Sequence, residues 1–225
     1  MPTSYFGAES GVAKAVTLVR AERANTAGSA LKFGVIGLGV GTIAAYAQAG
    51  DTVRFYEINP NVIRIANDTR FFTYLADCRG TLKIVPGDAR LSMERELAIV
   101  DSPKFDILAV DAFSGDAPPL HLLTKQAFQV YLGRLAPEGI VAFNVTNSYV
   151  DLSPVVRGIA ENLGLHSVFL HSDGDGRVTL YNDWVLVSRS PDLLFAPHIS
   201  DVKPTSWRKI PIWTDDYSNL LRVLR

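Results

Sequence analysis

The stretch from residue 31 to residue 42 reads LKFGVIGLGVGT, an apolar run that ends in the closely spaced glycines Gly37, Gly39 and Gly41. Glycines at such a turn let the backbone bend sharply and approach a ligand closely, and the helix start behind them offers free N–H groups. A dinucleotide fingerprint would need its third glycine where Thr42 stands, so that pattern fails. The observed G-x-G-x-G is typical of S-adenosylmethionine-type enzymes, and no GK[ST] follows to make a phosphate loop.

Strand-like and helix-like segments alternate along the rest of the chain. The predicted strands cover 31–37, 52–57, 82–85, 105–111, 139–145, 165–171 and 178–188. The predicted helices cover 43–48, 61–68, 89–97, 120–135 and 151–163. Apolar strands separated by helices predict an α/β fold, a Rossmann-like, doubly wound, mostly parallel seven-stranded sheet with an antiparallel C-terminal hairpin.

Composition narrows the class of protein. The chain has 225 residues, of which 48% are hydrophobic and 20% charged, so it can bury a large core. Its net charge of −1 gives no reason to expect a nucleic-acid partner. Cys78 is the single cysteine, which excludes an internal disulfide and a cysteine zinc cluster, and the four histidines lack metal-ligand spacing, so no metal is expected.

The organisation that we expect has three parts: an N-terminal segment (1–30), a nucleoside-binding catalytic domain (31–190) and a tail (191–225) that packs near the active site. The first residues lack a basic stretch followed by an apolar one, and the longest apolar runs have the length of strands. We therefore expect no secretory signal and no direct membrane insertion, and a cytoplasmic location, either free or as a soluble domain of a membrane-attached protein.

Two acids follow the second and third predicted strands. Glu57 ends the second strand 20 residues after Gly37, where a carboxylate can accept hydrogen bonds from both ribose hydroxyls. Asp88 follows the third strand, where it can accept from an adenine amino group or cap the helix that begins at Ala89. Because open α/β sheets bind ligands at the carboxyl ends of their strands, we expect the glycine loop, Glu57, Asp88 and Ala89 to bind the cofactor.

A second acidic loop, DAFSGDAPP, follows the most apolar strand. Two nearby carboxylates, Asp111 and Asp116, can hold a cationic amine and accept its proton. The same acids can instead form an Asx-turn or a helix cap.

Weaker candidates for substrate binding lie at the two ends of the chain. Tyr5 can line a pocket or simply pack. Asp215, Asp216 and Tyr217 can close over the acceptor or form a capped helix start.

Several motifs together resemble the spermidine synthase-like (polyamine aminopropyltransferase) family, in particular the branch that often follows a membrane segment. They are YFGAES, GLGVGT, FYEINP, GDAR, VDAFSGDAPPLHLLT and WTDDYSNLL, and they extend from about Tyr5 to Leu221. The resemblance implies a transferase of polyamine biosynthesis that moves an aminopropyl group from decarboxylated S-adenosylmethionine to a diamine such as putrescine. It implies that Asp111 deprotonates the amine and that Asp116 anchors it. The family also implies a possible homodimer.

Three departures from the family pattern keep other functions open. Val40 stands where the family commonly has an acid, four residues separate Asp111 from Asp116, and the N-terminal β-hairpin region is reduced to the segment around Tyr5. The first alternative is a methyltransferase that uses intact S-adenosylmethionine and shares the same nucleoside site. The second is a non-catalytic domain that binds a nucleoside or a polyamine.

Overall fold

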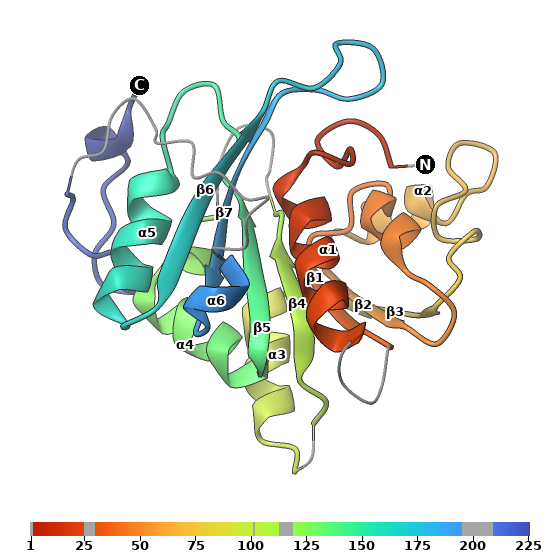
Figure 1. Ribbon diagram of the computed structural model, residues 1–225, viewed down its shortest axis with the longest axis horizontal. Helices are drawn as coiled ribbons and strands as arrows, with labels where there is room; N and C mark the ends of the chain where they lie inside the picture. Colours follow the sequence, from red (N-terminus) through yellow and green to blue (C-terminus); the bar gives the residue numbers. More distant parts are fainter. Residues whose placement is uncertain (1, 25–29, 101, 113–118, 195–208) are drawn as a thin grey trace.

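The computed structural model describes residues 2–24, 30–100, 102–112, 119–194 and 209–225, and in these ranges seven strands form one mixed sheet (Figure 1). The strands are β1 (Lys32–Ile36), β2 (Thr52–Glu57), β3 (Thr81–Pro86), β4 (Phe105–Val110), β5 (Leu135–Asn144), β6 (His166–Ser172) and β7 (Asn182–Ser188). Their order is β3-β2-β1-β4-β5-β7-β6; β7 is antiparallel to both β5 and β6, and the other neighbouring strands are parallel. The predicted fold class is confirmed. The chain turns outward in both directions from β1 and β4, which places a crevice at their carboxyl ends.

Helices cover both faces of the sheet. One face carries α1 (Gly11–Ala24), the 3-10 helix η1 (Thr42–Tyr46), α2 (Pro60–Ala66) and α6 (Pro191–Leu194). The other carries α3 (Ala89–Leu97), α4 (Lys125–Arg134) and α5 (Ser153–Asn162). Alternation along β4 divides the apolar side chains between two cores, with Ile107 and Ala109 in one and Leu108 and Val110 in the other.

Side-chain caps fix where three helices begin. Asn59 accepts from the N–H of Asn61, with Pro60 in the first turn of α2. Asp88 caps α3, which spans the predicted residues. Thr124 caps α4 by accepting from the N–H of Ala127, and this cap divides the helix predicted over 120–135. The 3-10 helix η2 (Leu120–Leu122) precedes the cap, and Leu135 already begins β5.

Other segments also differ from the prediction. The helix predicted over 43–48 is the short 3-10 helix η1. The strand predicted from residue 178 begins only at Asn182, because the carboxylate of Asp175 accepts from the N–H groups of Arg177, Val178 and Thr179 and holds a turn there.

Helix α1 was not predicted, although Ser10 supplies the start signal by accepting from the N–H of Ala13. The helix packs against β4, β5 and β7. The predicted N-terminal segment, residues 1–30, thus contains a helix that packs on the sheet of the predicted catalytic domain.

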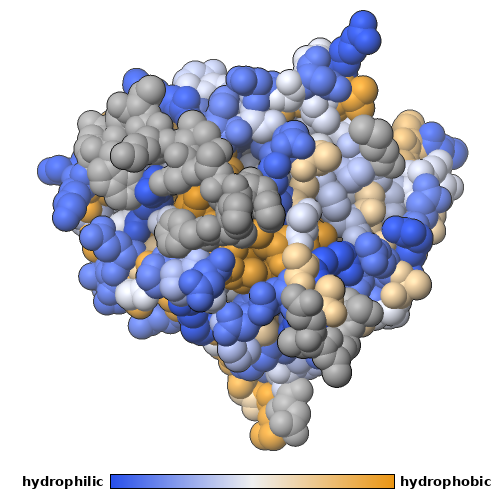
Figure 2. Space-filling view, viewed as in Figure 1, coloured by the Kyte–Doolittle hydropathy of each residue, from blue (hydrophilic) through white to orange (hydrophobic). Residues whose placement is uncertain are grey.

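Hydrophilic residues cover most of the periphery of the face drawn in Figure 2. In the described ranges, no helix combines the length and the apolar character needed to cross a bilayer.

Candidate functional site

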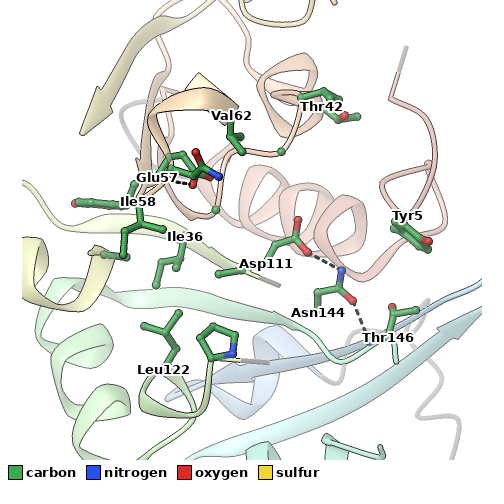
Figure 3. Close-up of a pocket in the computed structure, with 18 of the residues that line it drawn as sticks. Tyr5, Ile36, Thr42, Glu57, Ile58, Val62, Asp111, Leu122, Asn144 and Thr146 are labelled. Atoms are coloured by element: carbon green, nitrogen blue, oxygen red, sulfur yellow. Dashed lines mark hydrogen bonds between the residues drawn. The ribbon is translucent and has the colours of Figure 1, made fainter. Parts of the chain in front are cut away.

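A pocket of about 650 Å³ opens at the carboxyl ends of the central strands (Figure 3). Its volume lies within the range of small-molecule sites in proteins. Seven of the residues predicted from the sequence line it: Tyr5, Gly37, Gly39, Glu57, Asp88, Ala89 and Asp111. The structure therefore brings together predicted site residues that are up to 106 positions apart in the chain, from Tyr5 to Asp111.

The three glycines of the loop have different surroundings. Gly37 has a φ of +92°, and a Cβ there would lie 2.3 Å from the carbonyl oxygen of Asp111, so only glycine lets the ends of β1 and β4 meet. Gly39 has a φ of +52° and borders open space. Gly41 is not among the described lining residues, and a Cβ there would lie 2.5 Å from the Leu75 side chain. Its place is in the turn into η1.

Glu57 ties the glycine loop to the end of β2. Its buried carboxylate accepts from the N–H of Leu38 at 2.9 Å through Oε2 and from the N–H of Asn59 at 2.7 Å through Oε1. Each carboxylate oxygen can accept more than one hydrogen bond, so lone pairs remain for a ligand. Glu57 can therefore hold the loop and accept from hydroxyl groups at the same time.

Asp88 shows the helix-cap contact that the sequence left open, together with a second partner. Its Oδ1 accepts from the N–H of Leu91 at 2.8 Å, and its Oδ2 lies 3.0 Å from Nε2 of His121. His121 also lines the pocket. A ligand amino group that approached Asp88 would share Oδ2 with the imidazole.

Asp111 follows β4 and is held by Asn144, the last residue of β5. The Nδ2 of Asn144 donates to Oδ1 of Asp111 at 2.7 Å, and Figure 3 shows the contact as a dashed line. Burial raises the pKa of the Asp111 carboxyl to about 7, while the hydrogen bond from Asn144 acts in the opposite direction. A carboxyl that titrates near neutrality can give or take a proton under physiological conditions.

The N-terminal segment forms one wall of the pocket. The N–H of Ser4 donates to the carbonyl of Val178 at 2.8 Å, and the N–H of Leu180 donates to the carbonyl of Ser4 at 3.1 Å. These bonds fasten the segment to the loop between β6 and β7. Tyr5 and Tyr181 both line the pocket as a result.

The tail residues lie elsewhere. Asp215 forms a two-pronged ion pair with Arg90 of α3, at 2.7 and 2.6 Å, and accepts from Thr124. This pairing lowers the pKa of Asp215 to about 2. Asp215, Asp216 and Tyr217 are not among the described lining residues, so the structure does not bring them together with Asp111. Asp116 lies outside the described residues.

Among the pocket residues that the sequence reasoning missed, Asn144 and His121 contact the predicted acids through their side chains. Asn144 could have been predicted, because it is the polar residue that ends the apolar run GIVAF, and the same pattern selected Glu57 and Asp111. His121 gave no comparable signal, because its contact with Asp88 joins positions 33 residues apart.

The pocket wall is rich in acids. Its described residues include Glu57, Asp88 and Asp111 together with His121, and no lysine or arginine. Such a wall favours a cationic ligand over an anionic one. Within the same ranges, no group of three or more histidine, cysteine or acidic side chains is arranged to hold a metal ion.

Comparison with known proteins supports the fold and suggests a family. No family model matches the chain. A segment of 113 residues, 49% of this chain, is 32% identical to a polyamine aminopropyltransferase of Vibrio vulnificus and spans only 36% of that relative.

Solved structures share the fold at low sequence identity. The human methyltransferase-like protein 13 in complex with SAH matches with a TM-score of 0.58 and 19% identity, over 80% of this chain and 81% of that one. A probable spermidine synthase from Corynebacterium glutamicum matches with a TM-score of 0.55 and 20% identity, over 78% and 63% of the two chains. The O-methyltransferase from Bacillus cereus in complex with SAH matches with a TM-score of 0.53 and 15% identity, over 81% of this chain and 83% of that one. The chain thus has the fold of the S-adenosylmethionine-dependent methyltransferases, which is also the fold of that spermidine synthase.

Proposed function

We propose that the chain is an aminopropyltransferase that moves the aminopropyl group of decarboxylated S-adenosylmethionine to a diamine, with Asp111 as the base. The observation that carries the proposal is the position of the Asp111 carboxyl, which lines an acidic pocket beside the glycine loop and is held by Asn144 through one of its oxygens. The segment related to a polyamine aminopropyltransferase supports it.

The donor nucleoside is proposed to lie against the ends of β1, β2 and β3. The backbone at Gly37 and Gly39 lets it approach closely. Glu57 accepts from the ribose hydroxyls with the lone pairs that its two backbone bonds leave free. Asp88 and Ala89 face the adenine, with Oδ2 of Asp88 as the acceptor for its amino group.

The charge of the wall favours the decarboxylated donor. Intact S-adenosylmethionine carries a carboxylate, which three nearby acids repel and which no described lysine or arginine of the wall attracts. The decarboxylated form has two positive charges, on the sulfonium and on the amine. The spermidine synthase-like family commonly has an acid at the position of Val40. Because valine carries no charge, Asp111 is proposed to supply part of the attraction for the donor amine.

The proposed reaction is an in-line displacement. An alkylammonium has a pKa of about 10.4 in water, so the acceptor arrives charged and must first lose a proton. An N–H bond breaks and the proton passes to the carboxylate of Asp111. The nitrogen lone pair then bonds the aminopropyl carbon next to sulfur, the C–S bond breaks, and its electron pair stays on sulfur as neutral methylthioadenosine.

The acceptor side is proposed to consist of Asp111, Tyr5 and the turn after β5. Asp116 is included in this proposal on the basis of the sequence, because it lies outside the described residues. Asp215 is committed to Arg90, so we propose that the tail supports α3 and does not touch the diamine.

The test uses both donors. The protein is incubated with decarboxylated or intact S-adenosylmethionine, each with putrescine, and the products are identified by mass spectrometry. Methylthioadenosine and spermidine from the decarboxylated donor alone are expected. S-adenosylhomocysteine would replace the proposal with methyl transfer, and tight donor binding without any product would replace it with a binding domain. Asp192→Asn, at an exposed position of α6, serves as the charge-matched control for Asp111→Asn.

A further inference from the structure

Asn144 is fixed in one orientation by its own backbone surroundings. Its Oδ1 accepts from the N–H of Thr146 at 3.0 Å, so the opposite end of the amide, Nδ2, must face Asp111. An amide NH₂ can only donate, which means that the oxygen of Asp111 facing it must accept. The side chain is also buried and comes from the last residue of β5, so it has little freedom to turn away.

The two oxygens of Asp111 therefore differ. Oδ1 is taken by Asn144, and across the described chain Oδ2 has no hydrogen-bond partner. Figure 3 shows the second oxygen pointing away from Asn144. Because Asp111 lines the pocket, Oδ2 is the oxygen whose lone pairs are all free to accept from a ligand.

We propose that Asn144 is a positioning residue that holds Oδ1 of Asp111 and reserves Oδ2 as the atom that takes the proton of the attacking amine. The catalytic part of this inference rests on the proposed function. In that reaction an N–H bond of the ammonium breaks, an O–H bond forms at Oδ2, and the amine keeps the electron pair with which it attacks. Asn144 itself exchanges no proton.

The hydrogen bond from Asn144 also favours the charged form of the carboxyl, against the effect of burial. Other ionisable groups share the pocket wall: Glu57, Asp88, His121, Tyr5, Tyr56 and Tyr181. In the residues that the structure describes, none of them hydrogen-bonds Asp111, so Asn144 is the contact through which its titration can be altered selectively.

The decisive experiment follows Asp111 itself. The ¹³C resonance of the Asp111 carboxyl, assigned with Asp111→Asn, is titrated by NMR in the ligand-free protein and in Asn144→Leu, which keeps the size of the side chain but removes the donor. We expect the midpoint to lie near 7 in the unaltered chain and to rise by about one pH unit in Asn144→Leu. An unmoved midpoint in a folded variant would overturn the inference.

Asn144→Asp extends the series. A second carboxyl beside Asp111 removes the donor and adds like charge, so the midpoint should rise further than in Asn144→Leu. Thermal melting and methylthioadenosine binding check that both variants fold. A variant that failed to fold would leave the other to decide.

Kinetics then separate the two proposals. The acidic limb of the kcat/KM profile should move to higher pH in the same order as the NMR midpoints. Asn144→Leu should also cost little further activity once Asp111→Asn is present, since it acts through Asp111. A shifted NMR midpoint without aminopropyl transfer to putrescine would sink the proposed function and keep the coupling between Asn144 and Asp111. If the activity losses of Asn144→Leu and Asp111→Asn were additive and the acidic limb of the kcat/KM profile did not move, Asn144 would have only a structural role.

Discussion

Glu57 and Asp111 stand on opposite sides of β1, each at the end of a neighbouring strand, and their carboxyls are bonded in different ways. Both oxygens of Glu57 accept from backbone N–H groups of the chain. Asp111 accepts through one oxygen from a side chain, and within the described residues the other oxygen has no partner. A carboxylate that is held by the backbone shapes a loop and presents fixed acceptors. A half-buried carboxyl with one free oxygen in a pocket wall is suited to exchange a proton.

The comparison is tested most strongly by Asp111→Asn, which keeps the shape of the side chain and removes the base. We expect kcat/KM for aminopropyl transfer to fall about 10³-fold. Affinity for methylthioadenosine, measured by calorimetry, should stay within about threefold, because the proposed function puts Asp111 on the acceptor side of the pocket. Retained turnover at the level of Asp192→Asn would remove Asp111 from the chemistry.

The reciprocal change is Glu57→Gln. The amide of glutamine would place an NH₂ against one of the two backbone N–H groups and would weaken both the loop and the proposed ribose contact. Methylthioadenosine affinity is expected to fall about 10- to 100-fold, as for lost hydrogen bonds to a charged group. Glu22→Gln, on the exposed side of α1, is the matched control. Unchanged affinity in Glu57→Gln would place the nucleoside elsewhere.

The raised pKa of Asp111 has a consequence for stability. A carboxyl that binds its proton more tightly when folded stabilises the fold fully below its unfolded pKa of about 4, and this contribution is lost as pH rises through about 7. Asp111→Asn should therefore be more stable than the unaltered protein at pH 8, by about 1–2 kcal/mol, and similar to it near pH 4. Urea unfolding at pH 8 and at pH 4 measures this difference in stability. A variant less stable than the unaltered protein at pH 8 would contradict the destabilising effect of burying the charged carboxylate.

The smallest effect is expected at Asp215, a third acid that is paired with an arginine at a partly exposed position. Its pKa is lowered to about 2, so its contribution is present above the unfolded value of about 4 and is lost as pH falls through about 2. Solvent screens the pair, so Asp215→Asn should lower the free energy of unfolding at pH 7 by less than about 1 kcal/mol. Donor affinity should not change; a drop of tenfold or more would bring the tail into the site.

Much of this comparison was visible in the sequence, because strand ends can be located from apolar runs and parallel strands end at one edge. Glu57 and Asp111 were found in this way, and so was the α/β class. Thr124 illustrates the limit: the apolar spacing over 120–135 is continuous, and only the capping contact divides it. Helix α1 illustrates a second limit, because the strands against which its apolar face packs come much later in the chain.

Side-chain partners were beyond the sequence for a further reason. The contacts of Asn144 with Asp111 and of Asp215 with Arg90 join residues 33 and 125 positions apart. Nothing in local spacing selects one acid for a pocket and another for an ion pair on a helix. That choice is made by how the tail packs on α3 and α4.

The difference in surroundings between Gly37 and Gly39 is useful for redesigning the preference for the donor nucleoside. At residue 37 even one methyl group would push apart two strand tips, whereas residue 39 borders empty space. The positive φ at Gly39 is one that asparagine adopts more readily than most residues. A library aimed at new nucleosides should accordingly vary position 39 and leave its neighbour two residues earlier untouched.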